Sequence, residues 1–337
     1  YFLYKYYYMK LNIQDMKKYG LIVVSIVILY ILYTLFFSKS ISNVVNIDDK
    51  NTYDLHVYPW GTQIMIKDLM TSSHTGDVIN DKFVWERKPQ KYSGFYQLDT
   101  GSHLLTDLLM MSRNDLKTNL DKHGVKYDDL HSSGYAYLQG GTPPINIHQD
   151  VRVDGKYHKM PVGLMALGEQ KNMLREREIV NGVFGLAHIH DGHPLKNYAV
   201  TDVLFKTAPK RSIMIDFKNE RMIVGHPVPT DYTFMGKMDY GKEGMMRMDV
   251  WISDDKGKQN KLLVDTGTLY SQYLWKGPQT LKGIDERDSK GSLKMNNAKI
   301  LPKELVGTGQ MILGYNDLYH GYMYIDYDTD TMYINQN

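Results

Sequence analysis

The residues best suited to chemistry are two copies of one tripeptide, Asp-Thr-Gly, each at the end of an apolar run. The first copy is Asp99–Gly101 and the second is Asp265–Gly267. Two carboxyls held side by side cannot both ionise at low cost, so one of them keeps its proton. Such a pair supplies a general base and a general acid together, which is the chemistry needed to add water to an amide.

Each tripeptide has a second motif downstream, two apolar residues followed by glycine. These motifs are Val183–Gly185 and Ile312–Gly314. Glycine lets one backbone pass close to another, so we expect each motif to cross beside an aspartate turn. One Asp-Thr-Gly is a common turn sequence, but two copies with matching partners predict an internally duplicated fold.

The elements that must position these turns are predicted to be mostly strands. Short runs rich in Val, Ile, Tyr and Met are separated by Gly, Pro, Asp and Asn, a pattern typical of strands and turns. Examples are residues 56–58, 64–66, 212–215, 221–224, 247–252 and 322–325. Residues 112–122 and 196–206 are the best helical candidates outside the amino-terminal region. The expectation is an all-β body of two related halves.

With these motifs the sequence resembles the pepsin-like aspartic endopeptidases, a bilobal all-β family. Its motifs follow the family's order between Phe95 and Asn337: Leu98–Ser102, Asn181–Ala187, Val264–Thr268 and Ile312–Gly314, the last continuing through Tyr322–Tyr327 and Thr331–Ile334. The resemblance implies an N-terminal lobe over residues 53–228 and a C-terminal lobe over 229–337, related by a pseudo-twofold axis.

The resemblance also implies the roles of particular residues. The catalytic pair would be Asp99 and Asp265, acting through one shared water and one shared proton. The loops would support them through Thr100, Gly101, Ser102, Thr266, Gly267 and Thr268. The two threonines after the aspartates would bond across to the opposite loop, and the Ser102 and Thr268 hydroxyls would donate to the outer carboxylate oxygens. Flap and substrate-binding residues would be Tyr137, Gln139 and Gly140. The substrate would be an extended peptide or protein, and no metal or organic cofactor is implied.

Two departures from the family pattern keep a rival interpretation open. Thr106 stands where the family usually has a flap-supporting tryptophan, and Gly314 follows Asp265 more closely than Gly185 follows Asp99. The rival is a catalytically inactive relative that serves as a peptide-binding or assembly module. A dimeric one-lobe protease is unnecessary because one chain carries both tripeptides, so a monomer is expected.

Residues 19–38 carry no charge, and a helix of that length spans a bilayer core of about 30 Å. They are therefore predicted to form one transmembrane helix, between a tail over 1–18 and a tether over 39–52. Lysines precede the run, which favours a single-pass anchor with the body on the non-cytoplasmic side. A cleaved signal peptide and a buried core helix are the alternatives, and a prosegment starting in the tether stays open.

Composition and the remaining motifs exclude several classes. The formal charge of +2, from 40 basic and 38 acidic residues, argues against a nucleic-acid partner. Without cysteine the chain has no disulfide, thiolate metal site or cysteine nucleophile. Residues His188–His193 include three histidines and an aspartate that could hold a metal ion, but a solvated surface loop is the expectation. A serine triad using Ser102 lacks the Gly-x-Ser-x-Gly elbow.

Overall fold

The computed structural model describes most of the chain beyond residue 50. The described ranges are 51–57, 64–66, 70–71, 96–109, 111–129, 144–166, 182–193, 195–239, 247–253, 257–273, 277–284, 289–300 and 310–337. Contacts divide the chain into Tyr1–Asp48 and Asp49–Asn337, and the first of these units lies outside the described residues. The predicted transmembrane helix over 19–38 belongs to that unit. Among the described residues, no helix is both long and apolar enough to cross a bilayer.

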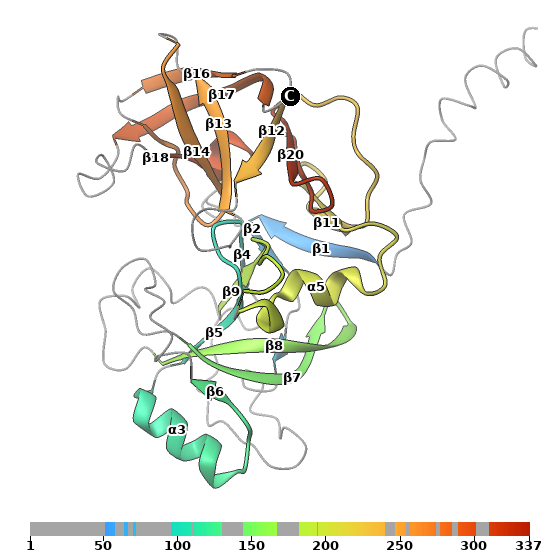
Figure 1. The fold of residues 1–337 in the computed structure, drawn as a ribbon, viewed down its shortest axis with the longest axis vertical. Coiled ribbons are helices and arrows are strands. Elements are labelled where there is room, and N and C mark those ends of the chain that lie inside the picture. The colour runs from blue at the N-terminus through green and yellow to red at the C-terminus, as the bar shows by residue number, and fades with distance from the viewer. Residues whose placement is uncertain are drawn as a thin grey trace, which may run out of the picture. The chain divides into compact units, whose positions relative to one another are not determined.

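The described residues are mostly β-strand, which confirms the predicted all-β class (Figure 1). We call β1 to β11 the first half and β12 to β20 the second half. The first half comprises β1 (Thr52–Val57), β2 (Ile64–Ile66), β3 (Met70–Thr71), β4 (Tyr96–Asp99), β5 (Leu105–Leu109), β6 (Asp128–Asp129), β7 (Ile145–Val153), β8 (Lys156–Ala166), β9 (Gly182–Gly185), β10 (Ser212–Asp216) and β11 (Arg221–Val224). The second half comprises β12 (Phe234–Asp239), β13 (Arg247–Ser253), β14 (Gln259–Asp265), β15 (Gln272–Tyr273), β16 (Gly277–Gly283), β17 (Ser289–Ile300), β18 (Gln310–Gly314), β19 (Tyr322–Asp326) and β20 (Thr331–Asn335). Strand β1 begins at Thr52, the last residue of the predicted tether.

Two α-helices occur in the described part of the chain, α3 (Arg113–Lys122) and α5 (Val200–Phe205). The prediction for 112–122 is confirmed, and Ser112 caps α3 by accepting a hydrogen bond from the Asp115 amide at 3.1 Å. The stretch predicted to be helical over 196–206 is helical in two parts. The 3₁₀ turn η4 (Lys196–Tyr198) precedes α5, and the extended backbone of Ala199 separates them. A second 3₁₀ turn, η5 (Tyr315–Asp317), follows β18.

The same strand pairings occur in both halves. In the first half β4 runs parallel to β9, β5 pairs antiparallel with β9 and parallel with β8, and β8 pairs antiparallel with β7. In the second half β14 runs parallel to β18, β15 pairs antiparallel with β18 and parallel with β17, and β17 pairs antiparallel with β16. The register places Asp99 beside Gly185 and Asp265 beside Gly314. The predicted crossing of each glycine motif beside an aspartate turn is therefore present twice.

A sheet in the order β1, β11, β10, β19, β20, β12 joins the halves. Strands β10 and β19 meet antiparallel, with Met214 opposite Tyr324 midway along the pairing. The hairpin after each strand turns at a residue with positive φ, Glu220 at 53° and Asp330 at 50°. Corresponding residues thus face each other across a local twofold relation.

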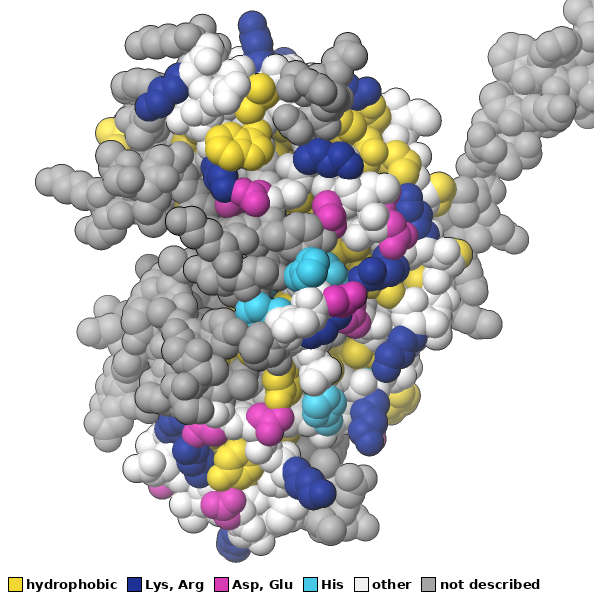
Figure 2. Space-filling model, in the orientation of Figure 1, with side chains coloured by type: hydrophobic (Ala, Val, Ile, Leu, Met, Phe, Trp, Pro, Cys, Tyr) yellow, Lys and Arg dark blue, Asp and Glu magenta, His cyan; other side chains and the backbone are white. Residues whose placement is uncertain are grey.

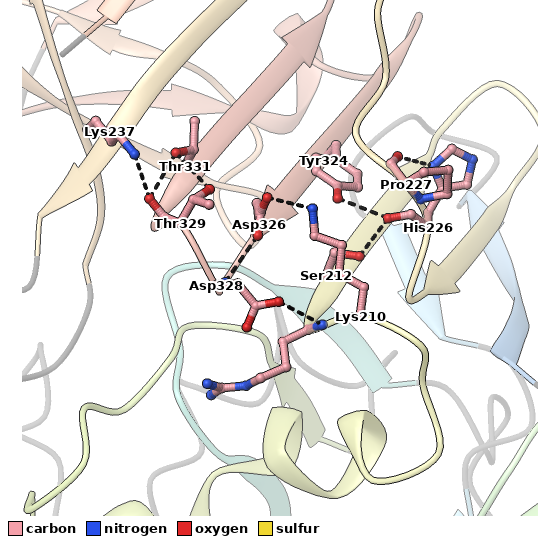
Figure 3. A network of polar contacts seen from close by, with 11 residues as sticks. Lys210, Ser212, His226, Pro227, Lys237, Tyr324, Asp326, Asp328, Thr329 and Thr331 are labelled. Atoms are coloured by element: carbon pink, nitrogen blue, oxygen red, sulfur yellow. Dashed lines mark hydrogen bonds and ion pairs between the residues drawn. The ribbon is translucent and has the colours of Figure 1, made fainter. Parts of the chain in front are cut away.

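Polar contacts reinforce this sheet where β10 meets β19 (Figure 3). Lys210 donates to the buried Asp326 carboxylate at 2.8 Å, and the Asp328 amide donates to the same carboxylate at 3.1 Å. The hydroxyls of Ser212 and Tyr324 both donate to the carbonyl of His226, at 2.7 and 2.9 Å. A buried carboxylate needs such partners because its desolvation is otherwise unfavourable.

Apolar side chains from both halves form one continuous buried cluster, which includes Leu98 of β4, Phe184 of β9, Val264 of β14 and Leu313 of β18. These residues are fully buried directly beside the aspartate turns. The turns therefore rest on a close-packed base, which limits their movement.

On the face in Figure 2, acidic and basic side chains are interspersed among the described residues.

Candidate active site

Both aspartates end a strand in which buried and partly exposed side chains alternate. In β4, Tyr96 and Leu98 are buried, while Gln97 and Asp99 are partly exposed. Strand β14 alternates in the same way and ends at the partly exposed Asp265. Because side chains two residues apart share a face of a strand, each aspartate points away from the core.

The glycine of each tripeptide donates its amide to the aspartate of the same loop. Gly101 N donates to Asp99 Oδ1 at 2.7 Å, and Gly267 N donates to Asp265 Oδ1 at 2.8 Å. A Cβ on Gly267 would lie 2.7 Å from Asp99 Cγ, and one on Gly101 would lie 3.0 Å from Asp265 Cγ. Each glycine therefore lies against the carboxyl of the other half, which leaves little room for a side chain.

The threonines of the tripeptides lock the loops together. Thr100 Oγ1 donates to the Val264 carbonyl and Thr266 Oγ1 donates to the Leu98 carbonyl, both at 2.7 Å. Each hydroxyl also accepts from the amide of the other threonine at 3.1 Å. Both threonines are fully buried. The predicted bonds across to the opposite loop are therefore present as a reciprocal set of four.

The carboxyls of Asp99 and Asp265 lie within hydrogen-bonding reach of each other. Burial raises the pKa of the Asp99 carboxyl well above its ordinary value, and the charge and hydrogen bond of Asp265 raise it further. The amides of Gly101 and Ser102 act in the opposite direction. Two carboxyls this close cannot both ionise at low cost, so the pair shares one proton while it carries a single negative charge.

The residues after the glycines contribute differently in the two loops. Thr268 Oγ1 donates to Asp265 Oδ2 at 2.7 Å, as predicted. Ser102 donates to Asp99 through its backbone amide, whereas its hydroxyl was expected to do so. Behind the first loop, Leu186 N donates to the Asp99 carbonyl at 2.9 Å, and the buried Tyr327 hydroxyl donates to the Leu186 carbonyl at 2.6 Å.

The predicted flap residues Tyr137, Gln139 and Gly140 lie outside the described residues. Thr106, which replaces the expected tryptophan, is buried in β5 beside Val183 and Gly163. Its neighbour Asp107 is fully buried and accepts a 2.5 Å hydrogen bond from the hydroxyl of Tyr96. This buried pair could not be predicted from the sequence, because nothing in the spacing shows that residues of β4 and β5 meet there.

The solvated loop expected over 188–193 is present only in part, because its first histidine is buried. His188 is buried, its ring lies edge-on to Tyr327 with centroids 5.7 Å apart, and Arg211 approaches its Nε2 at 3.4 Å. His190 is exposed. Within the described ranges, no group of three or more His, Cys, Asp or Glu side chains is placed to hold a metal ion.

Burial and the nearby cations Lys196 and Arg211 lower the pKa of His188 to about 4. The unfolded chain takes up this proton near the ordinary value of 6.5, so acid favours unfolding between those pH values. We therefore expect the free energy of unfolding to fall by roughly 2–3 kcal/mol from pH 7 to pH 4 on account of this group. Urea unfolding at several pH values measures the effect. In His188→Gln this part of the decrease is expected to vanish, and the exposed His190→Gln is the control. An unchanged decrease in His188→Gln would contradict the burial of a neutral imidazole.

The site also contains a contact that sequence analysis missed. Gln97 Nε2 donates to the Gly267 carbonyl at 2.8 Å, across 170 positions of the chain. A glutamine two residues before an aspartate carries no signal by itself. The alternating pattern of β4 does predict that Gln97 and Asp99 share one face of the strand.

Comparison with known proteins does not identify a family for this chain. No protein-family model matches this chain, and no curated protein matches it.

Proposed function

We propose that this chain is an aspartic endopeptidase of the pepsin-like, bilobal kind, with Asp99 and Asp265 as its catalytic pair. The observation that carries the proposal is the hydrogen-bonded carboxyl pair, one member from each copy of a repeated arrangement of strands. The four threonine bonds support it, because they hold the two loops in one fixed relation.

In the proposed reaction, water bound between the carboxyls attacks the carbonyl carbon of a peptide. The ionised carboxylate, assigned to Asp265, takes a proton from the water as the C–O bond forms. Asp99 gives its proton to the carbonyl oxygen, which yields a neutral tetrahedral diol. Collapse of the diol breaks the C–N bond, and the proton on Asp265 passes to the leaving nitrogen. The diol returns a hydroxyl proton to Asp99, so the pair ends with its starting charge.

Hydrogen bonding in the loops fits these assignments. The Thr268 hydroxyl and the Gly267 amide donate to the two oxygens of Asp265, so an ionised carboxylate is stabilised there. Asp99 retains its proton because burial disfavours its charge. Activity is therefore expected at acid pH and should be lost as Asp99 ionises at higher pH.

We propose further that residues 19–38 anchor a monomeric body to a membrane, on its non-cytoplasmic side. The uncharged run of twenty residues supports the anchor, and the lysines before it support the orientation.

The proposal is tested by incubating the full chain, in membranes or detergent, with a peptide library at pH 3–6. Mass spectrometry of the products is expected to show internal cleavage, and a statine-type mimic of the tetrahedral diol should block it. Binding of the inhibitor without any cleavage would instead support the inactive peptide-binding relative. Absence of both cleavage and inhibitor binding would contradict the proposed site.

A further inference from the structure

The hydrogen bond from Gln97 to Gly267 joins the halves beside the carboxyl pair, and the proposed hydrolysis does not use it. Gln97 lies on the same face of β4 as Asp99, and both residues are partly exposed, although the Asp99 carboxyl itself is desolvated. Its amide reaches a carbonyl in the loop of the other half at 2.8 Å. The contact therefore begins on the strand of one aspartate and ends in the loop of the other.

Gly267 is also the residue whose backbone lies against the Asp99 carboxyl. A Cβ on this glycine would be 2.7 Å from Asp99 Cγ and 2.8 Å from each carboxyl oxygen. A contact that holds Gly267 in place therefore also limits the room on that side of the Asp99 carboxyl. The same glycine donates to Asp265 Oδ1, so its position affects both carboxyls.

The repeat shows that this contact is not required by the fold. Leu263 stands two residues before Asp265, as Gln97 stands two before Asp99, and the alternation of β14 places it on the corresponding face. An aliphatic side chain cannot donate to the Gly101 carbonyl. The bond thus breaks the twofold relation between loops whose threonine bonds are otherwise reciprocal.

We propose that Gln97 is a positioning residue that clamps Gly267 against the Asp99 carboxyl and so makes the two carboxyls inequivalent. The kinetic consequence rests on the proposed peptidase function, but the clamp itself does not. Among the described residues, Asp265 is the titratable group that faces Asp99, and the backbone amides of Gly101 and Ser102 donate to Asp99. A loosened Gly267 would admit water to Asp99 and favour its ionised form.

The test compares Gln97→Leu, which copies the residue at the equivalent position, with the wild-type full chain. The direct readout is the ¹³C NMR titration of the Asp99 carboxyl, identified by its disappearance in Asp99→Asn. In Gln97→Leu the titration is expected to move to lower pH, and the alkaline limb of peptide hydrolysis should move with it. We expect kcat to fall about tenfold with KM nearly unchanged. Gln259→Leu, at an exposed position of β14, is the matched control and should change neither the Asp99 titration nor kcat.

Gln97→Glu separates loss of the hydrogen bond from misfolding, since it keeps the length of the side chain. A protonated carboxyl can donate to the Gly267 carbonyl, whereas an ionised one cannot. This variant is expected to be close to wild type at low pH and to lose activity as the introduced carboxyl ionises. An unchanged Asp99 titration in Gln97→Leu would overturn the clamp. A shifted titration in a chain that cleaves no peptide would support the clamp and overturn the peptidase proposal.

Discussion

Replacing either Asp99 or Asp265 with asparagine is expected to reduce kcat for peptide hydrolysis by roughly 10³- to 10⁴-fold or more. An amide neither takes up nor releases a proton at these pH values, so the pair loses its base or its acid. The double variant should be scarcely worse than either single variant, because groups that act as one unit have non-additive effects. Steady-state hydrolysis of a peptide found in the library measures the loss.

Stability separates this effect from loss of the fold. The pKa of Asp99 is raised in the folded chain, so the folded state holds a proton that the unfolded state releases above about pH 4. Stability from this group is therefore greatest at low pH and is lost as pH rises toward the raised pKa. Asp99→Asn has no carboxyl to ionise, so its free energy of unfolding at pH 7 should equal or exceed that of the wild type. An Asp99→Asn chain that keeps most of its activity would rule out the proposed mechanism.

The carboxyl pair could be predicted from the sequence because each half carries the same local information. A strand that alternates buried and exposed residues must present its final aspartate away from the core. The glycine motif must then lie where only glycine fits, and Gly185 shows this, since a Cβ there would be 2.6 Å from the Leu104 amide nitrogen. Repetition of these constraints predicts the meeting of Asp99 and Asp265 before any tertiary contact is known.

Other features depend on contacts between distant segments, which spacing does not show. His188 follows a glycine motif as a surface residue would, but Tyr327 and Arg211 cover it. The helix expected over 196–206 is divided because Ala199 is extended between η4 and α5, although its helix propensity is high. Tertiary packing overrides local preference in both cases.

Removing a threonine hydroxyl from the reciprocal set is expected to have the largest effect on stability. Thr100→Val keeps the side-chain shape but leaves the Val264 carbonyl and the Thr266 amide without their present partner. These groups lie beside fully buried residues, and an unpaired buried polar group costs about 1–3 kcal/mol. We therefore expect Thr100→Val and Thr266→Val each to lower the free energy of unfolding by roughly 2–5 kcal/mol. Urea unfolding at a fixed pH measures these losses.

The double valine variant tests whether the loops act as one unit. Once one hydroxyl is gone, the loops can separate, and the remaining hydroxyl holds its partners less well. The double variant should therefore cost at least about 1 kcal/mol less than the two single losses added together. Thr→Ser at each position is the matched control, since it keeps the hydroxyl and should cost about 1 kcal/mol for the lost methyl group. Valine variants no less stable than their serine counterparts would mean that these four bonds do not hold the halves together, and the carboxyl pair would then need another cause.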